Sequence, residues 1–499
     1  MSFFRGGAAR AKLLARAGSV PPSWLQRSPE EGHRQKAVRL RSHCVPGEMR
    51  LKPPFKAYDV RGRVPGEFSA ALACRIGAAL VGFTGAKEVA LGRDARLSSP
   101  DIADAVAEGV IRAGADVADL GLCGTEQVYF ATGHLGCGAG VMVTASHNPA
   151  DYNGLKLVRE QARPISADTG LAEIQALAES PPSGAARGRR RRAKVLGAWR
   201  RRVLGFVSGL PMKPLRIVVN SGNGAAGPSA RKLSKRLPLE IVHLLAEPDG
   251  RFPNGVPNPL LASTRNATSE AVLASNADFG VAFDGDFDRC AFFDERGEFV
   301  DPYYTVGLFA SALLPAQPAV DRRVVHDPTL VWDTEEQVRS AGGEPFRNRA
   351  GHSFIKQRMR GEDAVYGGES SAHHYFRDFF YCDSGMIPWV LMAAILSAQG
   401  GGLAERAAER RRRYPASGEI NLPARRDPAP LMQRLAETYS ARGALIDHID
   451  GLSVEFPDWR FNLRPSNTEP LLRLNLETRA NPELLARKTA ELKHAASYS

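Results

Sequence analysis

Gly140-Val-Met-Val-Thr-Ala-Ser146-His-Asn-Pro-Ala-Asp-Tyr-Asn-Gly-Leu-Lys156 is an apolar run that ends abruptly in a serine among small and turn-forming residues. The apolar start, Val141 to Val143, predicts a buried strand, and the Asn-Pro and Asn-Gly pairs predict loops after it. In an open α/β sheet the carboxyl end of such a strand faces the ligand crevice. We therefore expect Ser146 to face a ligand, in the position of a nucleophile.

The alternative for Ser146 is that it only caps a following helix, which is the commoner role of a lone serine after a strand. Its neighbours favour chemistry. His147 and Lys156 place two basic groups beside the hydroxyl. Such groups suit an oxygen that carries a phosphoryl group and whose proton must be moved.

A second motif places three carboxylates, Asp284, Asp286 and Asp288, at alternate positions between two apolar segments. Carboxylates this close cannot all stay ionised without a cation, and hard oxygen ligands in a short loop suit Mg²⁺. A Ca²⁺ EF-hand is an alternative, because Glu295 falls at the twelfth position, but Arg289 stands where that loop requires glycine. An acidic surface turn is the other alternative.

A glycine pattern follows the predicted strand Leu215–Val219, in the sequence Asn220-Ser-Gly-Asn-Gly-Ala-Ala-Gly227. With Glu240 farther along, it matches a dinucleotide-binding motif. Pro228, however, stands where such a helix should present free amides, so a packing turn is our preferred interpretation.

Length and composition indicate the number of domains and the class of protein. A chain of 499 residues with 43% hydrophobic residues predicts three or four soluble α/β domains. No apolar run reaches the roughly 18 residues of a membrane span, so we expect no membrane association. The cysteines lack paired spacing, which predicts reduced thiols and a cytoplasmic location. They are Cys44, Cys74, Cys123, Cys137, Cys290 and Cys382.

The net charge of +12 is concentrated in two segments, 1–48 and 187–202, which hold nine Lys or Arg residues each. With those segments set aside, the rest of the chain is slightly acidic. A nucleic-acid partner is therefore not expected in spite of the charge.

The motifs together resemble the α-D-phosphohexomutases, most closely the bacterial phosphomannomutase/phosphoglucomutase branch. Thr144–Pro149 with Tyr152–Lys156 resembles the family's phosphoserine loop, and Asp284–Arg289 resembles its metal loop. Gly368–His373 and Arg464–Thr468 fall where its sugar-binding and phosphate-binding loops should be. The resemblance covers about residues 50–499. The sequence departs from the family's usual pattern at Thr329, Ser370 and Pro465.

The resemblance implies an α/β fold with four domains around a central cleft: three α/β domains with mixed sheets and a smaller α+β C-terminal domain. We place a disordered extension at 1–48, domain 1 at 49–195, domain 2 at 196–298, domain 3 at 299–415 and domain 4 at 416–499. The arginine-rich end of domain 1, 181–192, has the composition of a solvated linker.

The resemblance also assigns roles to individual residues. The catalytic set is Ser146, His147, Lys156, Arg289 and His352, with Lys156 as the first choice for general base. The substrate-binding set is Tyr58, Arg61, Glu369, Ser371, His373, Arg464, Ser466, Asn467, Thr468 and Arg473. The metal ligands are Ser146, Asp284, Asp286 and Asp288. For Arg61 alone, a surface salt bridge is the competing interpretation.

The activity that the resemblance implies is interconversion of mannose 6-phosphate and mannose 1-phosphate, with glucose phosphates as further substrates. It implies a phosphoserine, Mg²⁺, and a hexose 1,6-bisphosphate as intermediate and activator. We expect hexose phosphates as the partners and a monomer or weak dimer. The alternatives are a serine-nucleophile sugar phosphomonoesterase and a non-catalytic binding protein descended from a mutase.

Overall fold

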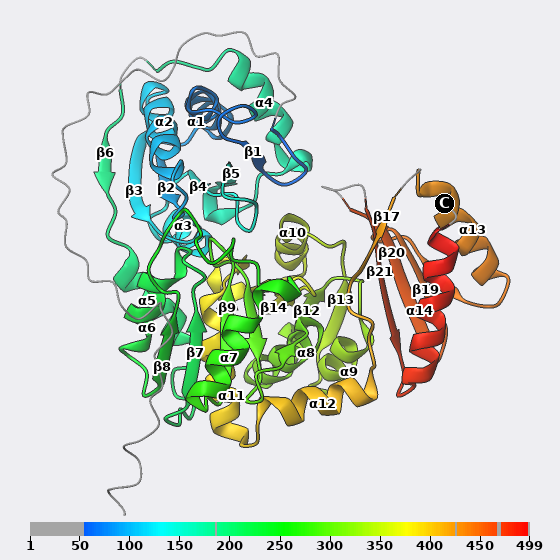
Figure 1. Ribbon diagram of the computed structural model, residues 1–499. Helices are drawn as coiled ribbons and strands as arrows, with labels where there is room; N and C mark the ends of the chain where they lie inside the picture. The colour runs from blue at the N-terminus through cyan, green and yellow to red at the C-terminus, as the bar shows by residue number, and fades with distance from the viewer. Residues whose placement is uncertain (1–53, 185–186, 425–426, 467–470, 498–499) are drawn as a thin grey trace, which may run out of the picture. The chain divides into compact units, whose positions relative to one another are not determined.

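A computed structural model describes residues 54–184, 187–424, 427–466 and 471–497. In these residues the chain forms four sheets, one after another along the sequence (Figure 1). Three of the sheets mix parallel and antiparallel strands, and the last is fully antiparallel. This is the predicted fold class, three α/β units followed by a smaller α+β unit.

The first sheet has six strands in the order β1-β5-β4-β2-β3-β6. β4, β2, β3 and β6 are parallel, whereas β5 runs antiparallel to β1 and β4. Every residue of β4 is buried, as the apolar run predicts. The strands are β1 (Val60–Arg63), β2 (Glu88–Arg93), β3 (Asp116–Leu122), β4 (Ala139–Val143), β5 (Tyr152–Arg159) and β6 (Arg190–Arg192), and the helices are α1 (Ala70–Thr84), α2 (Ser99–Arg112), α3 (Thr125–His134) and α4 (Leu171–Glu179).

The last three residues of the arginine-rich segment are exposed, and they form the edge strand β6, parallel to β3. Carboxylates of β2, β3 and α2 offset the charge of these arginines. Arg190 lies 2.7 Å from Asp104 and 2.8 Å from Asp119. Arg191 lies 2.7 Å from Glu88. Charged side chains on an edge strand also discourage pairing with another chain.

The second and third sheets repeat one plan, in which parallel strands are followed by antiparallel strands at one edge. Their orders are β11-β10-β9-β7-β8 and β13-β12-β14-β15-β16. The second comprises β7 (Arg216–Asn220), β8 (Glu240–Leu244), β9 (Phe279–Phe283), β10 (Cys290–Phe293) and β11 (Phe299–Val300), with α5 (Leu196–Gly205), α6 (Ala226–Ser234) and α7 (Asn266–Ser275). The third comprises β12 (Arg323–His326), β13 (Glu344–Arg347), β14 (Tyr366–Gly368), β15 (His374–Phe376) and β16 (Cys382–Asp383), with α8 (Pro302–Leu313), α9 (Trp332–Ser340), α10 (His352–Glu362), α11 (Met386–Gln399) and α12 (Leu403–Arg413).

The fourth sheet has the order β17-β21-β20-β19-β18, and its two helices lie beside it (Figure 1). The sheet and the two helices share one hydrophobic cluster. Leucines alternate along β21, so that Leu472, Leu474 and Leu476 are buried. Its elements are β17 (Ile420–Pro423), α13 (Ala429–Ser440), β18 (Leu445–Asp447), β19 (Leu452–Glu455), β20 (Trp459–Pro465), β21 (Leu471–Thr478) and α14 (Pro482–Ser497).

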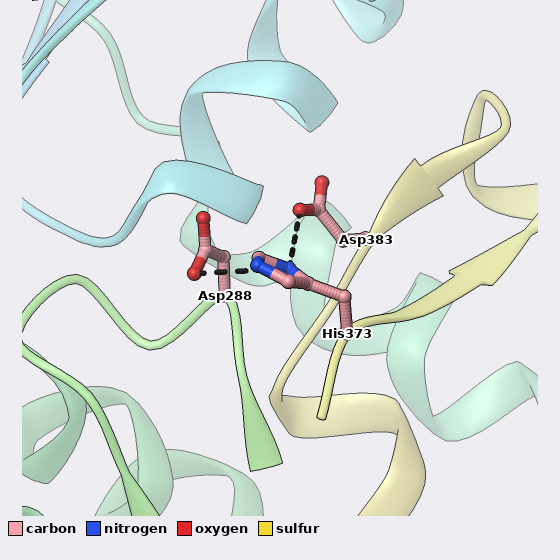
Figure 2. Close-up of side chains that lie close together, drawn as sticks. All are labelled: Asp288, His373 and Asp383. Carbon is pink, nitrogen blue, oxygen red and sulfur yellow. Dashed lines mark ion pairs between the residues drawn. The ribbon is translucent and has the colours of Figure 1, made fainter. Parts of the chain in front are cut away.

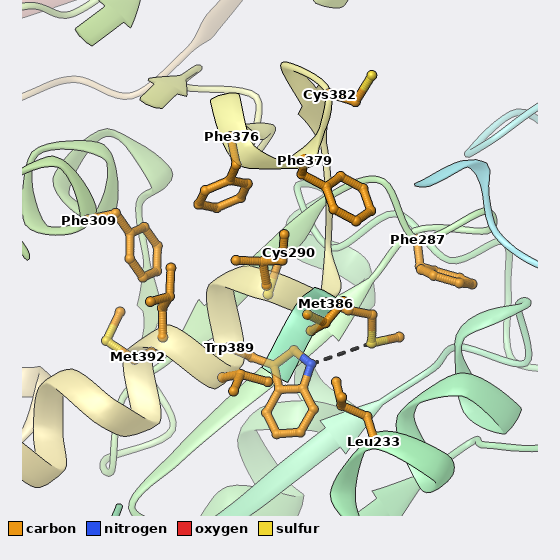
Figure 3. Packing of buried hydrophobic residues seen from close by; sticks show 14 of the residues in the cluster. Leu233, Phe287, Cys290, Phe309, Phe376, Phe379, Cys382, Met386, Trp389 and Met392 are labelled. Carbon is orange, nitrogen blue, oxygen red and sulfur yellow. Dashed lines mark hydrogen bonds between the residues drawn. The ribbon is translucent and has the colours of Figure 1, made fainter. Parts of the chain in front are cut away.

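The largest hydrophobic cluster is built around α11, in which Met386 to Ser397 are all buried (Figure 3). Trp389 lies among residues from distant segments, such as Leu233 of α6 and Phe376 of β15. Its indole Nε1 donates a hydrogen bond to Met386 Sδ at 3.4 Å. Because one cluster unites helices and strands of the first three sheets, the loops at their edges are held in fixed positions.

The glycine pattern after β7 packs chain against chain. A Cβ at Gly227 would lie 1.7 Å from the carbonyl oxygen of Ala246, and one at Gly224 would lie 2.8 Å from that of Gly285. Ala225 N–H donates to the same Gly285 oxygen at 3.0 Å. Glu240 forms an exposed ion pair with Arg216 at 2.9 Å. These contacts agree with a packing turn and leave the dinucleotide motif without its acidic partner.

Four cysteines, Cys123, Cys137, Cys290 and Cys382, are buried free thiols, as expected. Cys74 is disulfide-bonded, so the expectation of a reduced thiol is wrong at this position. Sequence spacing alone does not show which thiols meet in a folded chain. Cys44 lies outside the described residues.

No single helix in the described ranges is long and apolar enough to cross a membrane. α11 and α12 pass such a test of length and composition only as a pair bent by 93°. α11 is buried in the core described above.

Candidate active site

Ser146 lies in the turn after β4, with a backbone φ of +49°. Its Oγ donates to Asp284 Oδ2 at 2.6 Å and lies 3.1 Å from His147 Nδ1. Its N–H donates to Thr144 Oγ1 at 2.8 Å. The left-handed backbone and these bonds turn the hydroxyl toward the loop between β9 and β10. The structure shows no helix beginning at Ser146, so the capping role is not supported.

The loop between β9 and β10 holds Asp284, Asp286 and Asp288, all buried. Each offers a carboxylate oxygen, and the three oxygens lie within 4.8 Å of one another. Burial, reinforced by the charges of Asp288 and Asp286, raises the pKa of Asp284 to about 8. Three carboxylates at this spacing need compensating cations.

Protein cations supply part of that compensation. Lys156 Nζ lies 2.7 Å from Asp286 and 2.5 Å from Asp288. Burial alone would lower the pKa of Lys156, but these carboxylates outweigh burial and raise it. Arg289 Nε lies 3.9 Å from Asp284. In this arrangement Lys156 is therefore a cation.

The carboxylate cluster fits a hard metal ion. Oδ1 of Asp286 and Oδ1 of Asp288 are buried and accept no hydrogen bond from the described residues. Thr125, at the start of α3, donates its hydroxyl to Asp286 Oδ2 at 2.5 Å and thereby orients that carboxylate. Buried oxygens left without donors, beside the oxygen of Ser146, are the ligand type that Mg²⁺ prefers.

His373 lies against the same cluster (Figure 2). Its Nδ1 is 2.9 Å from Asp383 Oδ2 and 4.0 Å from Asp288 Oδ1, and Nε2 accepts from Arg289 Nε at 3.0 Å. Asp383 also pairs with the fully buried Lys356 at 2.6 Å. Sequence reasoning missed Asp383 and Lys356. The available signal was a lysine sharing the apolar face of α10 with Met359.

Tyr58 and Arg61 come from the segment that enters the first sheet, and His352 begins α10. The rings of Tyr58 and His352 meet edge-on, with centroids 5.9 Å apart. Burial, with the charge of Lys356, lowers the pKa of His352 well below its usual value. Arg61 donates to Asn148 Oδ1 at 2.6 Å and also pairs with Asp59. Arg61 thus contacts the Ser146 loop through Asn148. It also forms the salt bridge of the competing interpretation, with Asp59.

The predicted sugar-binding loop lies between β14 and β15. Glu369 is buried and accepts from Gly351 N–H at 2.7 Å and from the Tyr375 hydroxyl. Burial raises its pKa. Ser371 is partly exposed in the turn that follows.

Two of the three departures from the family pattern, Thr329 and Ser370, meet at one buried carboxylate. Asp327 accepts from Ser370 N–H at 2.5 Å and from Thr329 N–H at 2.9 Å. The Ser370 hydroxyl also donates to Asp327, at 3.0 Å.

The predicted phosphate-binding loop lies between β20 and β21, where Arg464 and Arg473 are paired in the strand register. Arg464 lies 3.7 Å from Asp450 and 3.9 Å from Glu419, and Arg473 lies 3.3 Å from Glu419. Ser466 is partly exposed. Asn467 and Thr468 lie outside the described residues.

Ser146, His147, Lys156, the three aspartates, Arg289 and His373 thus form one contiguous polar cluster, linked by the contacts above. Arg464 and Arg473 lie apart from it in sequence, on the fourth sheet, where they pair with carboxylates of the same C-terminal unit.

Family models match the chain in four consecutive parts. They describe the alpha/beta/alpha domains I, II and III of phosphoglucomutase/phosphomannomutase, at residues 52–183, 206–297 and 301–414, and the C-terminal domain, at 419–495. A protein from Xanthomonas campestris named "Phosphohexose mutases" is 52% identical over 442 residues, which cover 88% of this chain and 98% of that protein.

A phosphomannomutase from Escherichia coli strain K12 is 48% identical over 447 residues, covering 88% of this chain and 97% of its own. Among solved structures, a phosphoglucomutase/phosphomannomutase family protein from Burkholderia thailandensis matches with a TM-score of 0.79 and 31% identity. That match covers 89% of this chain and 96% of the other.

Proposed function

The chain belongs to the phosphoglucomutase/phosphomannomutase family, and on that premise we propose that it interconverts mannose 6-phosphate and mannose 1-phosphate, with glucose phosphates as further substrates. The observation that carries the proposal is the hydrogen bond of 2.6 Å from Ser146 Oγ to Asp284, within a buried cluster of three carboxylates. Relatives named phosphomannomutase, 48–50% identical to this chain, support mannose as the sugar.

The reaction moves a phosphoryl group between Ser146 and the sugar. The bond from phosphorus to Ser146 Oγ breaks as a bond to a free sugar hydroxyl forms. The hydroxyl proton leaves the sugar and a proton ends on Oγ, so none is consumed. The resulting hexose 1,6-bisphosphate turns around and returns its other phosphoryl group to Ser146 by the same steps in reverse.

We assign the proton transfer to Lys156, which pairs with Asp286 in this cluster. His147 also lies near the nucleophile, with Nδ1 3.1 Å from Oγ. As a cation, Lys156 gives a proton to the sugar oxygen when the phosphoryl group returns to Ser146, and it takes one back in the opposite step. His352, whose pKa is held low, is the weaker candidate for this role.

Ser146, Asp284, Asp286 and Asp288 would hold Mg²⁺. Oδ1 of Asp286 and Oδ1 of Asp288 accept no hydrogen bond from the described residues and would be free to bind the ion. When bound, the ion would offset the charge of the carboxylates and of the phosphoryl group. Arg289 and His373 then line the same charge cluster from the second and third sheets.

The remaining residues hold the sugar phosphate. Glu369, Ser371 and His373 would bind the sugar hydroxyls, for which a carboxylate, a hydroxyl and an imidazole provide acceptors and donors. Arg464, Ser466, Asn467 and Thr468 would bind the phosphate that is not being transferred, with Arg473 beside them. Tyr58 and Arg61 would close the site from the segment that enters the first sheet.

The test is a coupled assay on mannose 1-phosphate and glucose 1-phosphate with Mg²⁺ and hexose 1,6-bisphosphate, together with mass analysis of the peptide that contains Ser146. The parent should show turnover and gain a phosphate on Ser146. Ser146→Ala should lose turnover by at least about 1000-fold. The control Ser208→Ala, at an exposed position, should match the parent.

Release of inorganic phosphate decides between transfer and hydrolysis. A mutase should release far fewer moles of inorganic phosphate than the moles of sugar phosphate that it converts. Stoichiometric release would instead establish the phosphomonoesterase. An intact fold with no turnover on either sugar would establish a binding protein. The relatives favour neither alternative.

A further inference from the structure

Arg96 lies in the turn between β2 and α2, beneath the Ser146 loop, and has no part in the reaction above. Its side chain is fully buried. The guanidinium donates to four backbone carbonyl oxygens of that loop: those of Ser146 (2.8 Å), Asn148 (2.6 Å), Pro149 (2.6 Å) and Tyr152 (2.9 Å). A single side chain thus binds four carbonyls within the seven residues 146–152.

Asp94 anchors this arrangement. Its Oδ2 lies 3.3 Å from Arg96 Nε and accepts from the Thr144 hydroxyl at 2.8 Å. The oxygen of that hydroxyl accepts from Ser146 N–H. Both the N–H and the C=O of Ser146 are therefore tied to one buried carboxylate, the first through Thr144 and the second through Arg96.

The backbone of Ser146 needs such support. A φ of +49° is uncommon for a residue with a Cβ, and it persists only where the surroundings fix it. This backbone angle decides where Oγ points, because the side chain leaves from the same Cα. Without the bonds to the Ser146 carbonyl, the residue could relax to a commoner conformation and turn Oγ away from Asp284.

Arg96 also joins the Ser146 loop to the loop that follows β8 of the second sheet. Its backbone forms a β-bridge with Gly250, and its guanidinium lies 5.4 Å from the ring centroid of Phe252. The Ser146 carbonyl in turn packs on the metal loop, since a Cβ at Gly285 would lie 2.5 Å from that oxygen. These contacts fix the position of the loop that carries Ser146 relative to the loop that carries the aspartates.

We propose that Arg96 is a positioning residue for phosphoryl transfer, which holds Ser146 Oγ beside Asp284 in both half-reactions without touching the substrate. The proposal rests on the proposed function, in which Ser146 carries the phosphoryl group. It assigns Arg96 an effect on turnover rather than on sugar binding.

The experiment compares Arg96→Ala and Arg96→Lys with the parent. A misplacement of the reacting oxygen by about 1 Å can cost about 100-fold, so kcat of Arg96→Ala should fall by about that factor while KM stays within about threefold. Arg96→Lys keeps the charge but cannot reach four carbonyls. Its kcat should therefore lie between those of the parent and of Arg96→Ala.

The matched control is Arg265→Ala. Arg265 also donates to two loop carbonyls, those of Pro259 and Leu260, and lies over the ring of Phe299, but it belongs to the loop before α7. Its loss should leave kcat unchanged, so it reports the effect of deleting an arginine of this kind elsewhere.

Rescue separates positioning from mere support of the fold. Guanidinium ion at millimolar concentrations should raise kcat of Arg96→Ala at least about fivefold and should leave the parent unchanged, because the ion can occupy the vacated position. Phosphate incorporated on Ser146 from hexose 1,6-bisphosphate should slow in parallel with kcat.

The proposal is overturned if Arg96→Ala folds and keeps the parent's kcat, or if its kcat loss is matched by an equal loss of folded protein and is not rescued. If Arg96→Ala does not fold, Arg96→Lys decides: an unchanged kcat refutes the role, and a fall of about tenfold with KM retained supports it. A parent that gains no phosphate on Ser146 refutes the proposed function instead.

Discussion

Asp286 performs two tasks with its two oxygens. Oδ2 accepts from Thr125 and from Lys156, which tie the carboxylate to α3 and β5. Oδ1 is buried and accepts nothing from the described residues. A carboxylate fixed on one side and free on the other is prepared for a ligand, so its charge should matter more to catalysis than to folding.

Replacing Asp286 with asparagine tests this division. The amide keeps the size of the side chain but loses the charge, so Asp286→Asn should lower kcat by about 100-fold or more. It should also abolish the rise in melting temperature that Mg²⁺ produces in the parent. Asp294→Asn is the control, because Asp294 only accepts from loop amides of Arg296 and Glu298. Activity of Asp286→Asn within a few-fold of the parent would contradict the metal assignment.

Residues with a local signature could be found from the sequence. Ser146 ends an apolar run, and the aspartates alternate in a short loop, so both patterns are visible within about ten positions. Arg96, Asp383 and Lys356 have no such signature, because an arginine in a turn and a lysine in a helix usually face solvent. They become buried only when the chain folds, because their partners, such as Pro149 for Arg96 and His373 for Asp383, come from distant parts of the sequence.

At the scale of elements, α3 connects the metal loop to the core through its first turn. Glu126, next to Thr125, is buried and accepts from the indole of Trp199 (2.8 Å), the hydroxyl of Ser384 (2.6 Å) and the N–H of Met386 (3.0 Å). Burial raises its pKa to about 7 in spite of these donors. One carboxylate thus links α3, α5 and α11.

The shift predicts a pH-dependent contribution to stability. In the folded state Glu126 binds its proton more tightly than in the unfolded state, where the pKa is about 4.5. Its contribution is therefore fully present below about pH 4.5 and is lost as the pH rises through about 7, a change of about 3 kcal/mol. The free energy of unfolding of the parent minus that of Glu126→Gln should therefore fall by about this amount as the pH rises from 4.5 to 8, as measured by urea unfolding.

The control for this measurement is Glu173→Gln, on the exposed face of α4. It should leave the pH profile of the parent unchanged. A parent-minus-Glu126→Gln difference that is flat from pH 4.5 to 8 would show that the three donors hold the carboxylate ionised throughout.

Elements with a clear period were predictable, and the arginine-rich segment was not. Composition alone cannot show that Asp104, Asp119 and Glu88 line the sheet edge where β6 lies. The same limit applies to the glycines after β7, whose packing against Ala246 and Gly285 becomes visible only when the loops are placed together.

At the scale of the molecule, a buried ion pair within the fourth sheet, between Arg460 of β20 and Glu477 of β21, is hydrogen-bonded to segments of the third unit. Arg460 Nη1 lies 2.9 Å from Glu477 Oε1, and its guanidinium donates to the carbonyls of Pro328 and Thr329. Glu477 also accepts from Val331 N–H at 2.7 Å and from the Tyr303 hydroxyl. Both charged side chains are fully buried.

Breaking this pair should loosen the C-terminal unit. Arg460→Met leaves Glu477 buried without its cation, which should cost about 3–5 kcal/mol in the free energy of unfolding. Limited proteolysis should then cut faster between the third and fourth sheets. Arg442→Met, at an exposed position on the same unit, should change neither quantity. Equal stability of Arg460→Met and the parent would mean that the pair contributes no net free energy.

The proposed function requires one phosphate-binding loop to serve both ends of the sugar. In this structure Arg464 is compensated by carboxylates, Asp450 at 3.7 Å and Glu419 at 3.9 Å. Both distances are long for hydrogen bonds, so a phosphate that makes shorter, charge-assisted bonds can displace them. If the loop binds whichever phosphate is not being transferred, Arg464 must act in both half-reactions.

Arg464→Ala removes charge-assisted hydrogen bonds worth about 1.5–3 kcal/mol each from both bound orientations. The value of kcat/KM should therefore fall by at least about tenfold for mannose 1-phosphate and by a similar factor for mannose 6-phosphate. Arg442→Ala should leave both values unchanged. Steady-state kinetics in the two directions decide the matter, because a loop dedicated to one end of the sugar predicts a loss for one substrate only. That asymmetric result would falsify the reorientation of the bisphosphate as we have drawn it.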